Sequence, residues 1–356
     1  YMVVDLEIDP SGQVSAVWQR NFDDRGWASL RKLTHAEFSD KWNEYAEAGY
    51  FLRDQEAYIL DGTRYYAGVW IEKQASFGWA SYRNVTSAEF SERFTTYSEA
   101  GYMPIDVEAY QMGDEIRYSA IWVENVHNVD WNLRRNMSPT QYGDYFQQYS
   151  GHYRVWDLES YERNDAQNFA AIWVENTNGR EWAAVRDMDS RGFTNRWYAY
   201  RDRGYRLLDY DSYETDNGTR YLGVWRQVND RPDWVLKDDV NQLMQDHIDE
   251  FDPTSMTVAI AKDGEILYLR GFGHGDVADN KWANSRTVYR TASVAKALAG
   301  VLALRVEEDG DIDLNLSTSV YVPDMPAHHT HTVAHTLANR SGIGHYAHHT
   351  TPDEVQ

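Results

Sequence analysis

The sequence contains no cysteine, so the protein has no disulfide bond, no zinc–thiolate site and no cysteine nucleophile. Basic residues are also scarce, because 34 lysines and arginines stand against 56 aspartates and glutamates, for a formal net charge of −22. Such a surface repels phosphate backbones and anionic membranes, so we expect no nucleic-acid partner. No apolar run approaches the roughly 18 residues of a transmembrane segment, and residues 1–10 lack the pattern of a signal peptide.

Aromatic residues, in contrast, are abundant, at 14% of the 356 residues. Tryptophans recur with a period of about 52 residues, in two ladders that keep the same register. The first ladder is Trp18, Trp70, Trp122, Trp173 and Trp225, and the second lies nine residues further on, at Trp27, Trp79, Trp131, Trp182 and Trp234. Two ladders in one register indicate a single structural unit copied along the chain, in five partial or complete copies.

Each unit combines strand and helix signals. The first tryptophan closes an alternating, β-rich run such as residues 118–123, and the second opens a shorter strand-like run such as residues 79–83. A helix signal comes next, because Thr or Ser is followed three residues later by Glu or Gln, the pattern of a capping box. The three such pairs are Thr34 and Glu37, Thr86 and Glu89, and Ser138 and Gln141. The predicted unit is therefore strand, strand, strand, helix.

Aromatic residues at helical spacing follow each cap, for example Phe38, Trp42 and Tyr45. Because the aromatic positions keep to the strand and helix periods, we predict that the tryptophans form the core rather than a sugar- or peptide-binding surface. Any contact with protein or carbohydrate would then use the loops between strands. Pairs of Asp and Glu on the repeats could indicate a glycosidase, but in so acidic a chain we expect a solvated surface.

The aromatic periodicity stops after the last tryptophan, where we predict a domain boundary. The repeats then occupy residues 1–236 and a second domain occupies residues 237–356. Residues 239–251 have the pattern of an amphipathic helix. Residues 256–270 are predicted to form a β-hairpin, because Asp263-Gly264 near their middle favours a tight turn.

Ser293 and Lys296 form a Ser-x-x-Lys motif just before a helical run at residues 297–308. Residues three apart on a helix share a face, so the amine of Lys296 can accept the proton of the Ser293 hydroxyl and make it nucleophilic. The amine must be neutral to do this, which burial or a nearby positive group favours. At the start of the helix the backbone N–H of Ser293 would also face a developing oxyanion. Alone, the motif occurs by chance on many surface helices.

The sequence around this motif resembles a known family. In order, the similar blocks are residues 256–264, 268–275, 289–296, 304–314, 321–323 and 341–346. They resemble the beginning of serine β-lactamases and of penicillin-binding D-alanyl-D-alanine carboxypeptidases. The resemblance implies Ser293 as nucleophile, Lys296 as its base, no cofactor, and a peptide or a small amide or ester as substrate.

The repeats together with this domain resemble the fungal polyglycine hydrolases and related bacterial secreted proteins. The resemblance implies a secreted or periplasmic peptidase. The predicted fold class is α+β, with tandem β-β-β-α repeats followed by the N-terminal part of a β-lactamase-like α/β domain. The alternative is a repeat-based binding or adhesion protein whose β-lactamase-like domain is inactive or incomplete.

Two features of the resembled family are missing, a Tyr-x-Asn or related motif and a Lys-Thr-Gly-like strand. Tyr346 is not expected to be the catalytic tyrosine, because it lies in the block that ordinarily precedes that motif. We therefore expect the chain to stop inside its catalytic domain and to leave apolar surface uncovered.

Histidines gather in the same part of the chain, and dense imidazoles can bind zinc. They are His328, His329, His331, His335, His345, His348 and His349. No acidic or cysteine partner completes a recognisable zinc spacing, so we predict a polar loop and no metal ion.

Overall fold

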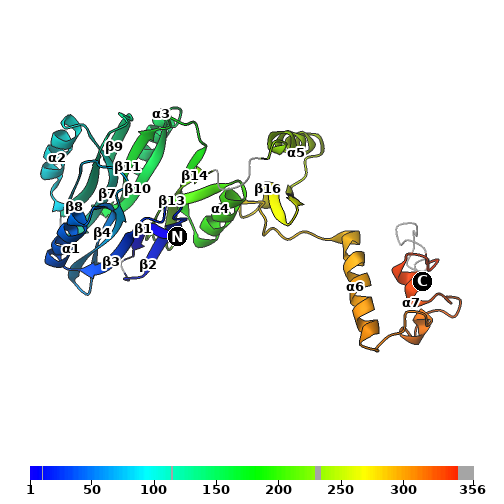
Figure 1. Cartoon of the computed structure of the whole chain (residues 1–356). Coiled ribbons are helices and arrows are strands. Elements are labelled where there is room, and N and C mark those ends of the chain that lie inside the picture. Colours follow the sequence, from blue (N-terminus) through cyan, green and yellow to red (C-terminus); the bar gives the residue numbers. More distant parts are fainter. Residues whose placement is uncertain (10, 114, 229–233, 344–356) are drawn as a thin grey trace. The chain divides into compact units, whose positions relative to one another are not determined.

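The computed structural model describes residues 1–9, 11–113, 115–228 and 234–343 (Figure 1). The chain divides into two compact units, Tyr1–Thr287 and Val288–Gln356. Small antiparallel sheets and helices make up the first unit, which confirms the α+β class. Among the described residues, no helix combines the length and the apolar character needed to span a bilayer.

Four copies of one motif follow a short two-stranded sheet, β1 (Met2–Ile8) with β2 (Val14–Gln19). Each copy has three strands and one helix. The copies are β3 (Trp27–Leu33), α1 (His35–Glu47), β4 (Tyr50–Leu60) and β5 (Thr63–Glu72); β6 (Trp79–Val85), α2 (Ser87–Glu99), β7 (Tyr102–Met112) and β8 (Glu115–Glu124); β9 (Trp131–Met137), α3 (Pro139–Tyr149), β10 (Tyr153–Arg163) and β11 (Ala166–Glu175); β12 (Trp182–Met188), α4 (Ser190–Asp202), β13 (Tyr205–Tyr213) and β14 (Arg220–Gln227).

Strand pairing shows where each copy of the repeat begins and ends. In the first complete copy the order is β3-β5-β4, so the strand before the helix pairs with the last strand of the copy. The predicted succession of three strands and a helix is observed, and the sheet begins at a tryptophan of the second ladder. Ala28 of β3 lies opposite Trp70 of β5, so the two tryptophan ladders meet within one sheet.

The first tryptophan ladder forms the core of the repeats, as predicted. Trp70, Trp122, Trp173 and Trp225 are fully buried. Aromatic residues of the helices cover them, and the ring centroids of Tyr45 and Trp70 lie 5.1 Å apart. Trp18 differs, with 55% of its surface exposed, because no helix covers the sheet of β1 and β2.

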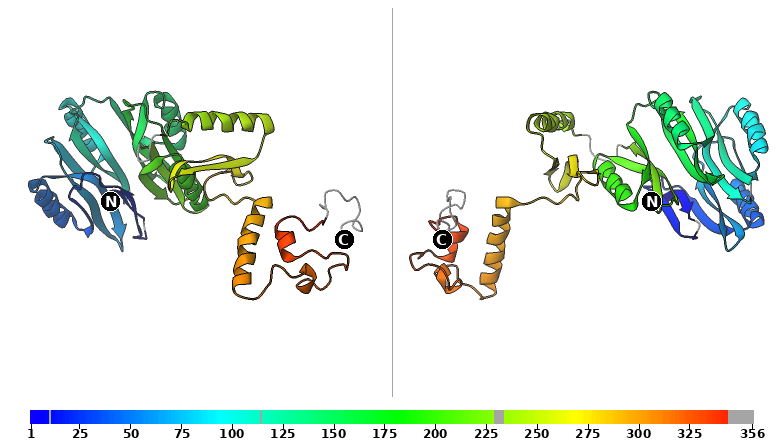
Figure 2. Two further views of the ribbon diagram at one scale, coloured as in Figure 1. Left: turned by 45° about the vertical axis from the view of Figure 1, so that its right-hand side comes forward. Right: turned by 180° about the vertical axis from the view of Figure 1, so that it is seen from behind.

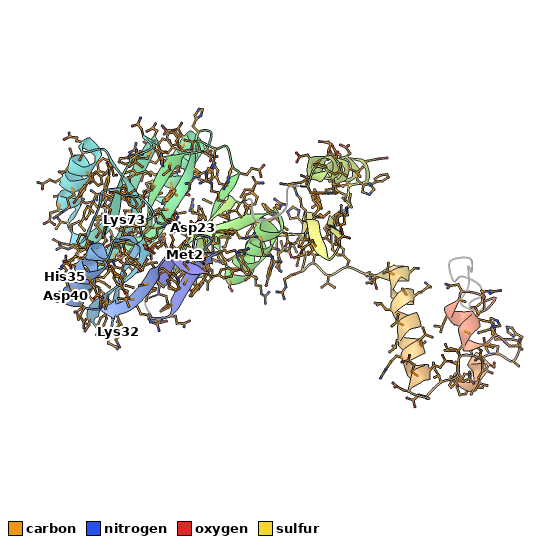
Figure 3. The ribbon with its side chains drawn as sticks, in the orientation of Figure 1. Met2, Asp23, Lys32, His35, Asp40 and Lys73 are labelled. Carbon is orange, nitrogen blue, oxygen red and sulfur yellow. The ribbon has the colours of Figure 1, made fainter. Side chains whose placement is uncertain are left out.

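The helix caps also follow the prediction. The capping boxes at Thr34, Thr86 and Ser138 are all present, with the side chain of each cap accepting a hydrogen bond from the third helical residue. His35 and Asp40 mark helix α1 at the edge of the repeats in Figure 3. Satisfying the free N–H groups at the start of each helix fixes where the chain turns from strand to helix.

One strand from each of the five sheets takes part in a closed ring, and in the four complete copies it is the strand that follows the helix. Strand β1 contacts β4, β4 contacts β7, β7 contacts β10, β10 contacts β13, and β13 returns to β1. Helices α1 to α4 lie at the periphery of this ring (Figures 1 and 2). The two-stranded sheet of β1 and β2 therefore closes the ring between the first and the last complete copy.

Each of these five strands carries two carboxyl groups that are separated by one residue and follow a β-bulge. Residues two apart on a strand share a face, and the bulge changes the direction in which their side chains point. The first carboxyl ring is Asp5, Asp54, Asp106, Asp157 and Asp209, and the second carboxyl ring is Glu7, Glu56, Glu108, Glu159 and Asp211. Seven of the ten are buried and three are half-buried, so the expectation of a solvated surface is wrong for these residues.

The first carboxyl ring ties neighbouring sheets together. Oδ2 of Asp157 accepts a hydrogen bond from the backbone N–H of Val107 at 3.1 Å, and Oδ2 of Asp209 accepts one from Leu158 at 2.9 Å. Burial, together with repulsion from neighbouring carboxyl groups, raises the pKa of Asp54 to about 8 and the pKa of Asp209 to about 7. These side chains thus connect sheets that share no strand ladder.

The remainder of the first unit contains the predicted helix and hairpin. The elements are α5 (Lys237–Phe251), β15 (Ser255–Lys262), β16 (Glu265–Asp276) and the short β17 (Lys281–Trp282). Asp263 and Gly264 have φ angles of 52° and 83°, so both adopt the left-handed conformation that a type I′ hairpin turn requires. The first compact unit, Tyr1–Thr287, includes this hairpin. The domain boundary between residues 236 and 237 stays a prediction from the sequence.

Helix α4 of the last repeat holds strand β17. The side chain of Asn195 donates to the carbonyl of Trp282 at 2.8 Å and accepts from its N–H at 2.9 Å. The guanidinium of Arg196 lies 3.4 Å from the centroid of the Trp282 ring. Asp202 accepts a hydrogen bond from the backbone N–H of Ser285 at 2.6 Å. The last repeat therefore fixes the backbone that leads out of the hairpin.

Replacing Asn195 by alanine should lower the free energy of unfolding by about 1–3 kcal/mol, because in this half-buried site the backbone N–H of Trp282 loses its partner and the carbonyl of Trp282 keeps the bond from Asn284 but loses the shorter one. Urea unfolding followed by circular dichroism measures the change. Arg191→Ala, at an exposed position of the same helix, is the control and should stay within about 0.5 kcal/mol of the parent. Equal effects of the two substitutions would contradict a specific role for Asn195.

Candidate active site

The second unit contains the Ser-x-x-Lys motif. Its described elements are a 3₁₀ turn, η1 (Ala292–Val294), helix α6 (Ala295–Glu308), a second 3₁₀ turn, η2 (Thr318–Val320), and the short helix α7 (Val333–Leu337). The helix begins two residues earlier than predicted, so Lys296 lies in its first turn and Ser293 in the 3₁₀ turn before it.

The structure brings the two predicted catalytic side chains together. Nζ of Lys296 donates a hydrogen bond to Oγ of Ser293, with 3.1 Å between the two atoms. The contact follows from the three-residue spacing, because the 3₁₀ turn and the first turn of α6 place both side chains on one face. A nucleophile and its base must lie within this distance for direct proton transfer.

The backbone just before Ser293 is strained. Ala292 has a φ of 43°, in the left-handed region that residues with a Cβ rarely adopt. Placing alanine there costs on the order of 1–2 kcal/mol. Strain of this kind gathers at sites where the chain must present one side chain in a fixed direction, and here it directly precedes the serine of the motif.

Both side chains of the pair are exposed, as is much of the apolar surface of α6. Leu298, Val301 and Leu302 each expose about two thirds of their surface. A helix with apolar residues all round is ordinarily buried, so the expected uncovered apolar surface is present on α6. Within the described residues of this unit, no neighbouring side chain buries Lys296.

Hydrogen bonds order the segment after α6. The hydroxyl of Tyr321 accepts from the backbone N–H of Asp313 at 2.7 Å, and Oε1 of Glu307 accepts from the N–H of Leu314 at 3.2 Å. These contacts fold the chain back near the end of α6. Tyr346, judged above not to be the catalytic tyrosine, lies outside the described residues.

The described histidines of this cluster, His328, His329, His331 and His335, occupy the loop before α7 and the first turn of α7. The rings of His328 and His329 are 4.1 Å apart, and burial lowers the pKa of His329. Nδ1 of His335 accepts a hydrogen bond from the backbone N–H of Thr332, which completes the cap of α7. No group of metal-ligand geometry that includes a histidine occurs in the part of the chain that the structure describes. Three of the seven histidines, His345, His348 and His349, lie outside it.

Two protein families match the sequence. A family model named Beta-lactamase matches residues 240–356, a range that includes Ser293 and Lys296. A second, described as polyglycine hydrolase-like structural repeat, matches four successive segments, residues 24–73, 77–125, 128–176 and 179–228. These four segments coincide with the four three-stranded sheets and their helices. Together they cover more than half of the chain.

Curated relatives match up to about a third of the chain. Serine beta-lactamase-like protein LACTB, mitochondrial, of Mus musculus is 31% identical over 104 residues, which are 28% of this chain and 19% of that protein. Protein flp of Staphylococcus aureus (strain N315) is 29% identical over 123 residues, 33% of this chain and 24% of that protein. Putative penicillin-binding protein PbpX of Bacillus subtilis (strain 168) is 32% identical over 105 residues, 30% of this chain and 27% of that protein. The chain thus spans 19–27% of the length of these relatives.

Proposed function

The chain belongs to the polyglycine hydrolase-like repeat family, and from this premise we propose that it is a serine hydrolase that cleaves an amide or ester through an acyl-enzyme on Ser293. The contact of 3.1 Å between Lys296 Nζ and Ser293 Oγ, inside the segment that matches the Beta-lactamase family, carries this proposal. Peptide cleavage is the favoured activity, because the repeats are of the polyglycine hydrolase type.

The proposed reaction uses the pair as nucleophile and base. Neutral Lys296 accepts the proton of the Ser293 hydroxyl while Oγ attacks the carbonyl carbon of the substrate. The proton then passes to the leaving amine or alcohol as the bond to the carbonyl carbon breaks. Water attacks the acyl-enzyme in the second half of the reaction and releases the acid and the free serine.

The surroundings of the pair add a requirement to this proposal. The side chain of Lys296 and the apolar side chains of α6 are exposed in this structure, although a helix with apolar residues all round is ordinarily buried. We therefore propose that the apolar side chains of α6 are covered in the active protein. We also propose that the protein is secreted or periplasmic, because it resembles secreted polyglycine hydrolases.

A covalent probe tests the proposal directly. A fluorophosphonate or a penicillin should modify the full-length protein once, and mass spectrometry of the digested protein should find the label on Ser293. Such labelling requires an activated hydroxyl, since an ordinary serine is a weak nucleophile. Folded full-length protein that neither probe labels would instead favour a repeat-based binding protein with an inactive β-lactamase-like domain.

A further inference from the structure

A cavity of about 570 Å³ opens at the second carboxyl ring of the repeats. All five members of that ring line it, and each comes from a different sheet. Because the five strands close on one another, the cavity lies where the sheets meet rather than between two of them. It is independent of Ser293 and of the function proposed above.

Three of these carboxyl groups have the spacing of ligands to one ion. The oxygens of Glu7, Glu159 and Asp211 lie within 4.8 Å of one another. Calcium binds oxygen at about 2.3–2.6 Å, so two of its ligands on opposite sides are about 4.6–5.2 Å apart. Magnesium demands near-ideal octahedral geometry and gives up its waters reluctantly, whereas calcium accepts about six to eight oxygen ligands in a flexible arrangement. Carboxyl groups that three separate strands hold in place therefore suit calcium better than magnesium.

Unpaired oxygens of the first carboxyl ring give a second observation. Oδ2 of Asp54 and of Asp106 is buried and has no hydrogen-bond partner, and these residues expose 4% and 2% of their surface. The carboxyl groups of Asp54 and Asp106 accept hydrogen bonds from the backbone N–H groups of Leu6 and Gln55 in the preceding strands. A buried acceptor without a donor is uncommon in native proteins and indicates a missing ligand, ion or water.

The charges around the rings are one-sided. Arg53 supplies a positive charge that acts on Asp54, Asp106, Asp157 and Asp209, one guanidinium among ten carboxyl groups. The carboxyl groups of Glu7 and Asp211 come within hydrogen-bond distance of each other. A divalent cation would offset the mutual repulsion of carboxyl groups held so close together.

We propose that the ring of repeats binds one calcium ion, with Glu7, Glu159 and Asp211 as protein ligands and with water completing the coordination shell. Oxygen-only ligands of negative charge are those that calcium prefers. The three ligands come from β1, β10 and β13, so the ion joins the two-stranded sheet to the last two repeats. It therefore stabilises the ring at the place where the first and last sheets meet.

To test the proposal, the full-length protein is first freed of metal with a chelator. Calcium chloride is then titrated into it near neutral pH, and isothermal titration calorimetry measures binding. One calcium ion should bind per chain, more tightly than magnesium does, and should raise the melting temperature. Glu159→Gln keeps the size of the side chain and removes its charge, so calcium affinity should fall by at least about tenfold. Glu92→Gln, which alters an exposed carboxylate on α2, should bind calcium as the parent does.

Luminescence of terbium, a substitute for calcium, gives an independent readout, because tyrosines that line the cavity can sensitise it. Glu7→Gln is the second variant and should lose the signal as Glu159→Gln does. Circular dichroism checks that both variants fold, and labelling of Ser293 should be unchanged in them if the full-length protein is an active hydrolase. No calcium binding by folded parent protein, or equal binding by Glu159→Gln and Glu92→Gln, would overturn the proposal.

Discussion

Replacing Ser293 by alanine in the full-length protein should lower the rate of acyl-enzyme formation by at least about a thousandfold, because the attacking oxygen is removed. The variant should still fold, since Ser293 is exposed and its described side-chain contact is the one with Lys296. Single-turnover kinetics on an amide, ester or β-lactam that the parent cleaves measures the rate. A variant that acylates at the parental rate would remove Ser293 from the mechanism.

Replacing Lys296 by alanine should suppress the same step by a comparable factor, because the hydroxyl of Ser293 then lacks the base that lies 3.1 Å away. Lys262→Ala is the matched control, since it removes an exposed lysine from the end of β15. Substrate binding, measured separately with a slowly cleaved analogue, should survive in both variants. If Lys262→Ala were as slow as Lys296→Ala, the effect would reflect net charge rather than the pair.

Replacing Trp122 by alanine should destabilise the repeats by about 3–5 kcal/mol, the range for large aromatic residues in a packed core. Trp122 is fully buried, its ring centroid lies 5.5 Å from that of Tyr97, and its Nε1 donates to the hydroxyl of Tyr82. Truncation removes these contacts and leaves a cavity between α2 and its sheet. Thermal or urea unfolding of the variant beside the parent measures the loss.

Trp18→Ala is the natural control for Trp122→Ala, because Trp18 holds the equivalent position of the first ladder but exposes 55% of its surface. Its truncation should cost about 1 kcal/mol or less. A Trp122→Ala protein with the same melting temperature or urea midpoint as the parent would show that this tryptophan does not stabilise the core. Equal large losses in both variants would place Trp18 in a buried interface.

The local features of this protein were predictable from the sequence. Capping pairs such as Thr34 and Glu37, the turn at Asp263-Gly264, and the contact of Ser293 with Lys296 each depend on residues one to four positions apart. Their geometry follows from the rise and twist of a helix or from the conformations that a turn allows. The tryptophan ladders also predicted a buried core, because a period that matches strands and helices reveals which faces are covered.

The burial of the carboxyl rings could have been predicted from the sequence, but these residues were assigned to the surface. Asp54, Asp106, Asp157 and Asp209 recur at a constant distance before the tryptophans of the first ladder, which is a signal of the same kind. Overall acidity hid that signal, since charged residues are ordinarily solvated. Burial of a carboxyl group is decided by what surrounds it and not by its own strand.

The sequence by itself thus determined the repeat, its strands and helices, the hairpin and the spacing of the serine and the lysine. Tertiary structure alone decided that β3 pairs with β5, that β13 returns to β1 to close the ring, and that ten carboxyl groups meet there. It also decided that Ser293, in the turn η1, and Lys296, in the first turn of α6, lie exposed. The reason is physical: periodicity and capping act between neighbours in the chain, whereas pairing, closure and burial depend on residues that the chain brings together from distant positions.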